Sequence, residues 1–162
     1  MKKIILLVFV AVFSLTLVAC SSLGKVKGVI EKEDYLIIDM DNSTEQSDVQ
    51  NTLANILREE YTKFETLQLE DGNAKLHVWA MLPTSPIQLT NPDFAIVVEF
   101  SSRGALVKEL SENAEFNSIV LGAIGEEVTE ELVYQKGLAV DNCFIYAKGA
   151  LSNNLYQAIV AK

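Results

Sequence analysis

Apolar and polar residues follow one another along the chain in patterns that predict a series of strands and helices. A strand is expected over Tyr35–Asp41, which is apolar at its start and is followed by a polar turn. Between Ser47 and Phe64, apolar residues recur every three or four positions, which is the spacing of one helical face. A turn at Asp71–Asn73 precedes a second apolar strand over Lys75–Leu82. The first half is thus predicted to form strand, helix and strand.

The second half contains the most apolar strand of the chain. Phe94–Phe100 is almost wholly apolar and β-branched, as expected for a central strand that is covered on both faces. A helix is expected over Arg103–Glu112, a strand over Cys143–Lys148, and a closing helix that Ser152 caps. The residues of the closing helix that we expect to face inward are Leu155, Ile159 and Val160.

Two segments are open to more than one interpretation. Over Asn117–Gly137 the apolar residues step by four, as in a helix, but each internal glycine would cost a helix about 1 kcal/mol. A short strand over Ser118–Leu121 and a helix from Glu126 fits nearly as well, and Gly137 ends either version. A loop of about eleven residues follows the second strand and is long enough to be functional or to wrap the domain. Its prolines are Pro83, Pro86 and Pro92.

The first residues have the three-part plan of a secretory signal. Lys2 and Lys3 form a basic start, residues 4–18 are uncharged and mostly apolar, and the small residue Ala19 precedes the predicted cleavage point. An apolar run of about 15 residues is shorter than the roughly 20 that a helix needs to cross a bilayer. The segment is therefore predicted to be a cleaved signal peptide.

The segment Leu17-Val18-Ala19-Cys20 resembles the lipobox of bacterial lipoproteins. This resemblance implies cleavage between Ala19 and Cys20, a diacylglycerol on the cysteine sulfur, and often acylation of the new amino terminus. Two or three acyl chains anchor a protein durably, since each buried methylene contributes about 0.8 kcal/mol. The residue after the cysteine is Ser21 and not an aspartate, and in Gram-negative lipoproteins this implies delivery to the outer membrane. In a Gram-positive cell the protein would stay on the outer face of its membrane.

The signal divides the chain into three predicted regions. Residues 1–19 form the cleaved signal peptide, residues 20–34 form the lipidated Cys20 and a tether, and residues 35–162 form a single globular domain. Without the signal, 143 residues remain, which is the size of one domain with its own core. The element order predicts an α+β (or α/β) fold, with a single mixed sheet of about four to five strands and helices packed on it.

Charge restricts the classes of partner. Lys2 and Lys3 leave with the signal, so 11 basic residues face 22 acidic ones and the mature net charge is about −11. Nucleic acids and anionic lipid headgroups favour clustered Lys and Arg, so both are disfavoured partners for the surface as a whole. Once Cys20 carries lipid, Cys143 has no partner for an intramolecular disulfide, and its apolar neighbours predict a small buried side chain.

The first strand, the helix after it and the second strand resemble the amino-terminal domains of the Tol-system protein TolB and of curli-secretion-type envelope lipoproteins. The resemblance covers about 45 residues, lies in the order of the elements, and implies an α/β fold. The turn after the first strand, with Asp39 and Asp41 two residues apart, also resembles for four or five residues the nucleophile motif of haloacid-dehalogenase-type phosphatases. That resemblance implies a small Mg²⁺-assisted phosphohydrolase, the alternative to a non-enzymatic role.

The phosphatase motif is incomplete, since the glycine that follows the second aspartate is missing. Two acidic residues near a helix amino terminus are also favoured by the helix dipole alone. As a calcium loop the segment lacks the glycine and the glutamate that such loops require. We therefore expect no catalytic residue, no cofactor apart from the covalent lipid on Cys20, and no metal ligand.

His77 and Trp79 form the candidate partner-binding patch. On a strand they share one side with Lys75 and Met81, and the proline loop is expected beside them. An aromatic patch of this kind suits a peptide, a glycan or a protein partner. The alternatives are a hydrogen-bonded strand histidine and a tryptophan that fills the core.

Two further groups of residues have structural explanations that we favour. The first is a set of glutamates that surrounds a helix as a solvated face: Glu126, Glu127, Glu130 and Glu131. The second is Ser101–Gly104, which either binds an anion at a helix start or is an ordinary strand-to-helix turn. The sequence thus predicts a membrane-anchored envelope lipoprotein that is a non-enzymatic binding or assembly module, with a protein partner in the cell envelope.

Overall fold

The computed structural model describes residues 21–32, 35–39, 55, 57–58, 61–83, 93–149 and 152–161. The elements in chain order are α2 (Ser22–Lys32), β1 (Tyr35–Asp39), β2 (Lys75–Pro83), β3 (Asp93–Glu99), α4 (Arg103–Glu112), α5 (Ala114–Ile124), α6 (Glu130–Gln135), β4 (Ala139–Val140), β5 (Cys143–Lys148) and α7 (Ser152–Val160). The signal segment, Ala19, Cys20 and Asp41 lie outside the described residues, as does the proline loop beyond Pro83.

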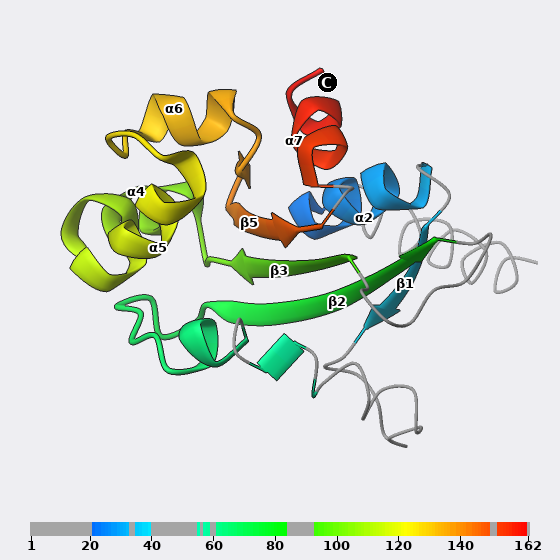
Figure 1. Ribbon diagram of the computed structural model, residues 1–162. Coiled ribbons are helices and arrows are strands. Elements are labelled where there is room, and N and C mark those ends of the chain that lie inside the picture. Colours follow the sequence, from blue (N-terminus) through cyan, green and yellow to red (C-terminus); the bar gives the residue numbers. More distant parts are fainter. Residues whose placement is uncertain are drawn as a thin grey trace, which may run out of the picture.

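The strands form one five-stranded sheet in the order β1-β2-β3-β5-β4, with helices packed on it (Figure 1). This α+β architecture confirms the predicted fold class and strand number. Every described strand pair is antiparallel, where a mixed sheet was expected. Strands that are consecutive in the chain pair directly in three cases, β1 with β2, β2 with β3 and β4 with β5, and β5 lies beside β3 after the three helices α4, α5 and α6.

The central strand β3 is covered on both faces, as its apolar sequence predicts. Six of its seven residues are buried, and alternate side chains enter two different cores. The large core is the cluster Leu57, Phe64, Leu67, Val78, Ala80, Phe94, Ile96, Val98, Phe100, Leu106, Leu110, Phe116, Val120, Val133, Leu138, Ala139 and Phe144. The small core is the cluster Val26, Val29, Ile30, Trp79, Met81, Ala95, Val97, Cys143, Ile145, Ala147 and Leu155.

Capping side chains set the bounds of the helices that follow β3. Ser102 accepts a hydrogen bond from the Ala105 amide at the start of α4, and Thr129 accepts one from Leu132 at the start of α6. Asn113 ends α4, and its Oδ1 accepts from the amides of the next helix at 3.1 and 3.0 Å. The helix over 103–112 is therefore confirmed, and capping explains where it stops.

The ambiguous segment forms two helices, α5 and α6, with no strand at Ser118–Leu121. Gly125 ends α5 in the left-handed conformation, with a φ of 77°. Gly137 follows α6 with a φ of 75°, as predicted, and a Cβ there would clash with the Tyr156 carbonyl oxygen. Glycine at 137 is thus required both by its backbone conformation and by the close approach of α7.

The tether expected over residues 20–34 is wrong for Ser22–Lys32, which form α2. One side of this helix buries Val26, Val29 and Ile30 against the small core. These positions are spaced by three and one, as required for one helical face. Their burial makes α2 part of the domain, lying beside α7 on one face of the sheet (Figure 1).

The closing helix α7 begins at Ser152, and its Leu155 is fully buried while Ile159 is partly buried. Val160, which was expected to face inward, is 52% exposed instead. On this helix, Tyr156 places its hydroxyl at the outer edge of β5. The Ala147 amide donates to that oxygen at 2.7 Å, and the hydroxyl donates to the Ala147 carbonyl at 3.2 Å. One side chain therefore satisfies both backbone groups of an edge position.

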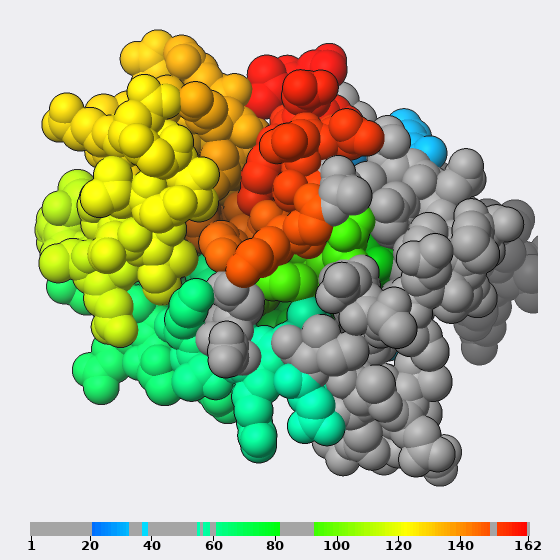
Figure 2. Space-filling view, in the orientation of Figure 1, coloured from blue at the N-terminus to red at the C-terminus, as the bar shows by residue number. Residues whose placement is uncertain are grey.

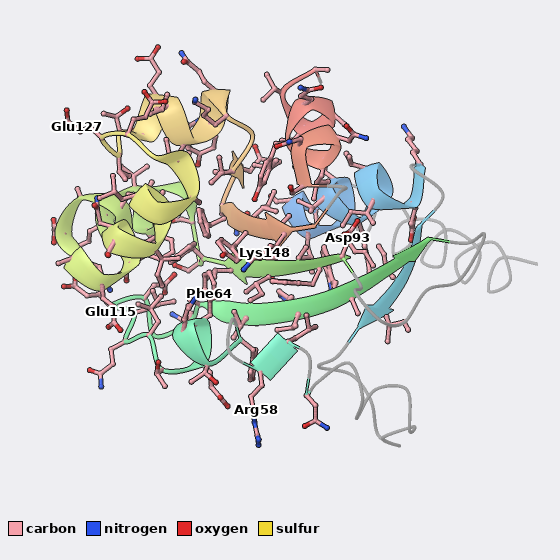
Figure 3. The ribbon with its side chains drawn as sticks, in the orientation of Figure 1. Arg58, Phe64, Asp93, Glu115, Glu127 and Lys148 are labelled. Carbon is pink, nitrogen blue, oxygen red and sulfur yellow. The ribbon has the colours of Figure 1, made fainter. Side chains whose placement is uncertain are left out.

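The helix predicted over 47–64 is confirmed where it is described, at residues 55, 57–58 and 61–65. Leu57 and Phe64 are buried in the large core, on the face of the sheet opposite α2 and α7, and Arg58 is exposed (Figure 3). Within the described part of the chain, no helix combines the length and the apolar character needed to span a membrane.

Candidate functional site

Asp39 is the last residue of β1, which is an edge strand that pairs with β2 and places Asp39 opposite Trp79. Ligand sites of open parallel sheets lie where the carboxyl ends of neighbouring strands meet, and β1 and β2 run in opposite directions. Its predicted partner Asp41 lies outside the described residues. The structure therefore does not bring the two aspartates of the phosphatase motif together in a described site.

The prediction that His77 and Trp79 form an aromatic patch at the surface is wrong for Trp79. Trp79 is fully buried, with 0% of its surface exposed, and it packs in the small core. Period-two alternation placed it on the correct side of β2, but that side is covered by α2. His77 lies next along the same side, with its ring centroid 6.4 Å from that of Trp79.

His77 is a hydrogen-bonded strand histidine. Its Nε2 lies 3.2 Å from Glu99 Oε2 on the neighbouring strand β3, and its side chain is 17% exposed. The register of the sheet pairs His77 with Val97 and Lys75 with Glu99, so the contact with Glu99 is diagonal. Of the two predicted patch residues, only His77 thus reaches the surface, and it does so beside a carboxylate.

The indole nitrogen of Trp79 is the one buried side-chain polar atom without a hydrogen-bond partner among the described residues. Lys27 of α2 lies over the indole ring, with its Nζ 5.6 Å from the centroid, a cation–π geometry. An unpaired buried donor costs about 1–3 kcal/mol. The small core therefore tolerates a polar defect that the large core does not show.

The turn Ser101–Gly104 binds a carboxylate of the protein itself, the side chain of Asp71. The Ser101 amide donates to Asp71 Oδ2 at 2.7 Å, and the Asn73 amide donates to Asp71 Oδ1 at 3.1 Å. The hydrogen bond from Ser101 holds the pKa of Asp71 below its usual value of 3.8. This explains the turn as a structural junction between β3 and the loop before β2.

A buried polar cluster, which the sequence analysis missed, joins that same loop to α4 and α5. Glu109 is only 2% exposed, and its two oxygens accept from the Asp71 amide at 2.9 Å and from Asn113 Nδ2 at 2.8 Å. The Asn113 side-chain amide also donates to the Gln68 carbonyl. A helical wheel gives a signal, because Glu109 falls between Leu106 and Leu110 on the buried side. Both carboxylate oxygens have partners, which is typical of a structural cluster.

The glutamates of the α5–α6 region do not converge on one point. Glu130 pairs with Arg103 at 2.8 Å, and Glu126 pairs with Lys136 at 2.8 Å. Glu127 lies in the loop between α5 and α6 and points away from the protein (Figure 3). No group of three or more potential metal ligands occurs in the ranges that the structure describes. The glutamates thus lie at the surface as predicted, but only Glu130 and Glu131 lie on a helix, because α6 begins at Glu130 and not at Glu126.

Cys143 is a free, fully buried cysteine in β5, as predicted. Burial raises the pKa of its thiol to about 12, and the nearby Glu99 and Asp141 act in the same direction. A thiol with such a pKa is almost entirely protonated at neutral pH, and the thiolate is the nucleophilic form. Cys143 therefore has the properties of a small core residue.

A groove of about 510 Å³ lies between α7 and the ends of α5 and α6. In Figure 2 it lies between the yellow and orange atoms of α5 and α6 and the red atoms of α7. Its apolar side chains include Ile124, Leu138 and Val160, and its polar rim carries Gln135, Lys136, Asn153 and Gln157. Nothing in the local sequence marks this groove, because it is formed by helices that meet only in the folded domain.

The groove is the best candidate binding site among the described residues. It combines an apolar floor with side-chain amides that both donate and accept hydrogen bonds, a combination suited to a polypeptide segment. Among the residues that the structure describes, its exposed Val160 is one of two large apolar residues with high exposure, the other being Leu121 of α5 at 43%. Comparisons of the chain with models of known protein families, with curated proteins and with solved structures found no match.

Proposed function

We propose that the chain is a membrane-anchored envelope lipoprotein, with lipid on Cys20, whose domain is a non-enzymatic binding or assembly module. The observation that carries this proposal is the coincidence of the lipobox with the start of the folded domain. The hydroxyl of Ser21, the residue after Cys20, accepts a hydrogen bond from the Gly24 amide at 3.0 Å and so caps α2. The predicted cleavage point therefore lies directly before the first helix of the domain.

The electrostatics of α2 support acylation of the new amino terminus as well. The amino end of a helix carries a partial positive charge, and the first turn of α2 has no acidic residue to compensate it. A free amino group on Cys20 would add another positive charge next to this end. Acylation removes that charge, so the modification that the lipobox implies also suits the helix that follows.

A binding role is supported by the groove between α7 and the ends of α5 and α6. A rim of Gln135, Asn153 and Gln157 offers amide groups to the backbone of a polypeptide, and the apolar floor offers contact area. We infer a protein partner in the envelope, in keeping with the acidic surface that disfavours nucleic acid. In a Gram-negative host the outer membrane is the proposed location.

The anchor is tested by replacing each cysteine separately. Cys20→Ser should release the domain from the membrane fraction and abolish incorporation of a labelled fatty acid. Cys143→Ser is the matched control and should leave both unchanged, because Cys143 is buried in the domain. Continued membrane retention of Cys20→Ser would contradict the proposed anchor, and fractionation of inner and outer membranes measures the location.

The binding role is tested by photo-crosslinking in intact cells. A photoreactive residue at Val160, which is exposed in the groove, should give a discrete adduct with an envelope protein. The same residue at Glu127, which is exposed but points away from the groove, is the control. Adducts of equal yield at both positions, or none at Val160, would argue against the groove as the binding site.

A further inference from the structure

An apolar pocket lies beside the amino-terminal half of α2, next to the small core. It has a volume of about 330 Å³ and lies between α2, β4 and α7. Small-molecule sites in proteins typically begin at about 300 Å³, so the pocket is large enough to take part of a ligand. The described residues that line it are Lys25, Val26, Val29, Val140 and Ile159.

Hydrocarbon forms nearly all of the described lining. Val26 and Val29 are 0% and 3% exposed, and Val140 and Ile159 are partly buried against the small core. Lys25 contributes its methylene stem, because its ammonium group is directed to Asp141 Oδ2, 2.6 Å away. None of these five side chains offers an amide or a hydroxyl group. A polar ligand would therefore lose hydrogen bonds to water without replacement, whereas an alkyl chain has none to lose.

The groove at Val160 differs from this pocket in its chemistry. Its rim carries the side-chain amides of Gln135, Asn153 and Gln157, which suit a polypeptide, whereas the pocket beside α2 suits hydrocarbon. Ile159 lines the pocket and Val160 lines the groove. Consecutive residues of α7 thus belong to two sites that favour different ligands.

The pocket lies beside the start of α2 and therefore close to the proposed anchor. Cys20 comes two positions before the first helical residue, Ser22, and two residues span at most about 7 Å. Ser22 Oγ donates to Asp141 Oδ2 at 3.3 Å, and Asp141 directly follows Val140 of the pocket. Lys25 lies about 5 Å further along the helix axis. A hydrocarbon chain on Cys20 would therefore begin within about one helical turn of the pocket.

The lipid that the lipobox implies contains chains of two kinds. The diacylglycerol has two ester-linked chains, which begin beyond the cysteine sulfur and the glycerol. The third chain is joined by an amide bond directly to the main-chain nitrogen of Cys20, so fewer bonds separate it from the domain. Two acyl chains already anchor a protein durably. The amide-linked chain is thus both the nearest to the pocket and the one that the anchor needs least.

We propose that the pocket lined by Val26, Val29, Val140 and Ile159 holds part of the amide-linked acyl chain of Cys20, while the two ester-linked chains insert into the bilayer. This inference rests on the proposed lipidation of Cys20. The pocket and the bilayer both remove methylenes from water, and the short connection through Ser21 keeps the chain at a high effective concentration beside the pocket. The docked chain extends the small core and joins the domain to its own lipid.

A photoreactive fatty acid locates the chain. Cells are fed a fatty acid with a diazirine at its far end, and the lipidated protein is purified, reconstituted in phosphatidylcholine vesicles and irradiated. After digestion, mild alkali cleaves the ester bonds and leaves the amide bond intact. We expect a peptide that contains Val140 or Ile159 to stay joined to the Cys20 peptide after this treatment.

The other outcomes separate the pocket from the anchor. Absence of label from the protein, in cells whose other lipoproteins are labelled, would overturn the proposed lipidation. Label that is incorporated but reacts only with bilayer lipid, or with peptides outside the pocket, would overturn the pocket assignment alone. Separation of the joined peptides in alkali would show that an ester-linked chain occupies the pocket and would overturn the assignment to the amide-linked chain.

Adjacent residues of α7 give a matched test of the pocket. Ile159→Trp places a larger side chain in the pocket, and Val160→Trp makes a comparable change in the groove. Ile159→Trp should reduce the adduct roughly tenfold, as expected when a site is overfilled, and Val160→Trp should leave it unchanged. Val140→Phe is a second filling variant if circular dichroism shows that Ile159→Trp is unfolded. Adduct yields that are equal in the filling variants and in Val160→Trp would contradict the proposal.

Discussion

The two cores on either side of the sheet are built from different parts of the chain. The large core joins the sheet to helices that lie between its strands in the sequence. Its aromatic rings meet edge to face, and the ring centroid of Phe116 lies 5.7 Å from that of Phe100 and 5.1 Å from that of Phe144. The small core depends on α2 and α7, the first and last described elements. One face of the sheet is thus covered by helices from between its strands, and the other by the first and last described helices.

This difference gives the residues after the predicted anchor a second role. On the large-core side, α4 follows β3 through a short turn, although Phe64 also packs against Tyr146 of β5, with 5.3 Å between the ring centroids. On the small-core side, the central strands stay uncovered until α2 packs beside α7. The same short segment therefore links the domain to the membrane and completes its second core.

The largest effect is expected from removing α2. A chain that begins at Tyr35 loses the burial of Val26, Val29 and Ile30, worth roughly 5 to 9 kcal/mol at 1.5–3 kcal/mol each. That is comparable with the whole stability of a typical domain. We expect loss of cooperative unfolding in circular dichroism, whereas a chain that begins at Ser21 should unfold cooperatively. Equal stability of the two chains would show that α2 contributes nothing to the domain and that residues 20–34 are a tether, as first predicted.

Single truncations compare the two cores directly. Phe116→Ala removes a fully buried ring from the aromatic group of the large core, and about 3–5 kcal/mol of stability should be lost. Ile30→Ala in α2 should cost about 2–5 kcal/mol, as for any well-packed core residue. Urea unfolding measures both. An Ile30→Ala cost below about 0.5 kcal/mol, typical of surface positions, would show that the small core is not packed.

The buried polar cluster beside the large core should be less costly to disturb. Glu109→Gln keeps the size of the side chain but replaces one acceptor oxygen by a donor, so one of two donors loses its partner. The expected loss is about 1–3 kcal/mol in urea unfolding. Glu112→Gln is the matched control, since Glu112 lies on the same helix but is exposed. A loss of equal size for both variants would contradict the role given to Glu109.

Asp71 makes part of the stability on the large-core side dependent on pH. Its pKa is lowered in the folded state below 3.8, chiefly by the Ser101 amide, so its contribution is present above 3.8 and is lost as the pH falls through the folded value. The stability difference between wild type and Asp71→Asn should therefore shrink below about pH 4. Thermal unfolding across that range measures it, and a difference independent of pH would refute the assignment.

The smallest effect is expected at the surface of α4. Arg103 pairs with Glu130 and lies over the Tyr134 ring, 4.4 Å from its centroid, but its side chain is 60% exposed. Exposed ion pairs contribute little to stability because water screens them, so Arg103→Ala should lower stability less than any of the substitutions above. High salt should reduce the effect of Arg103→Ala, which urea unfolding at two ionic strengths would detect.

Much of the fold could be predicted from the sequence, because local signals are strong where the chain folds on its neighbours. The helix over 103–112 and the strand over 143–148 match the structure at both ends, and the first has a capping residue at each end. The failure to predict α2 from the sequence has an identifiable cause. Its apolar positions have helical spacing, but two glycines and three lysines in eleven residues give it the composition of a linker.

The candidate site was harder to predict than the fold. Alternation along β2 placed Trp79 on the correct side, but its burial depends on α2, which approaches from a distant part of the sequence. The same limit applies to the groove at Val160, since that residue fits an apolar helical face and is exposed only because of how α7 packs. Contacts between distant elements decide both cases, and no local pattern contains them.

Hydrogen exchange of the α2 amides in the lipidated protein tests the account most directly. If α2 completes the small core, the amides of Val29 and Ile30 should be protected to a degree comparable with the amide of Leu155, the buried residue of α7. Their protection should disappear together with that of α7 when denaturant is added. Rapid exchange of the α2 amides in a protein whose β3 amides remain protected would show that this segment is a tether and would contradict the account.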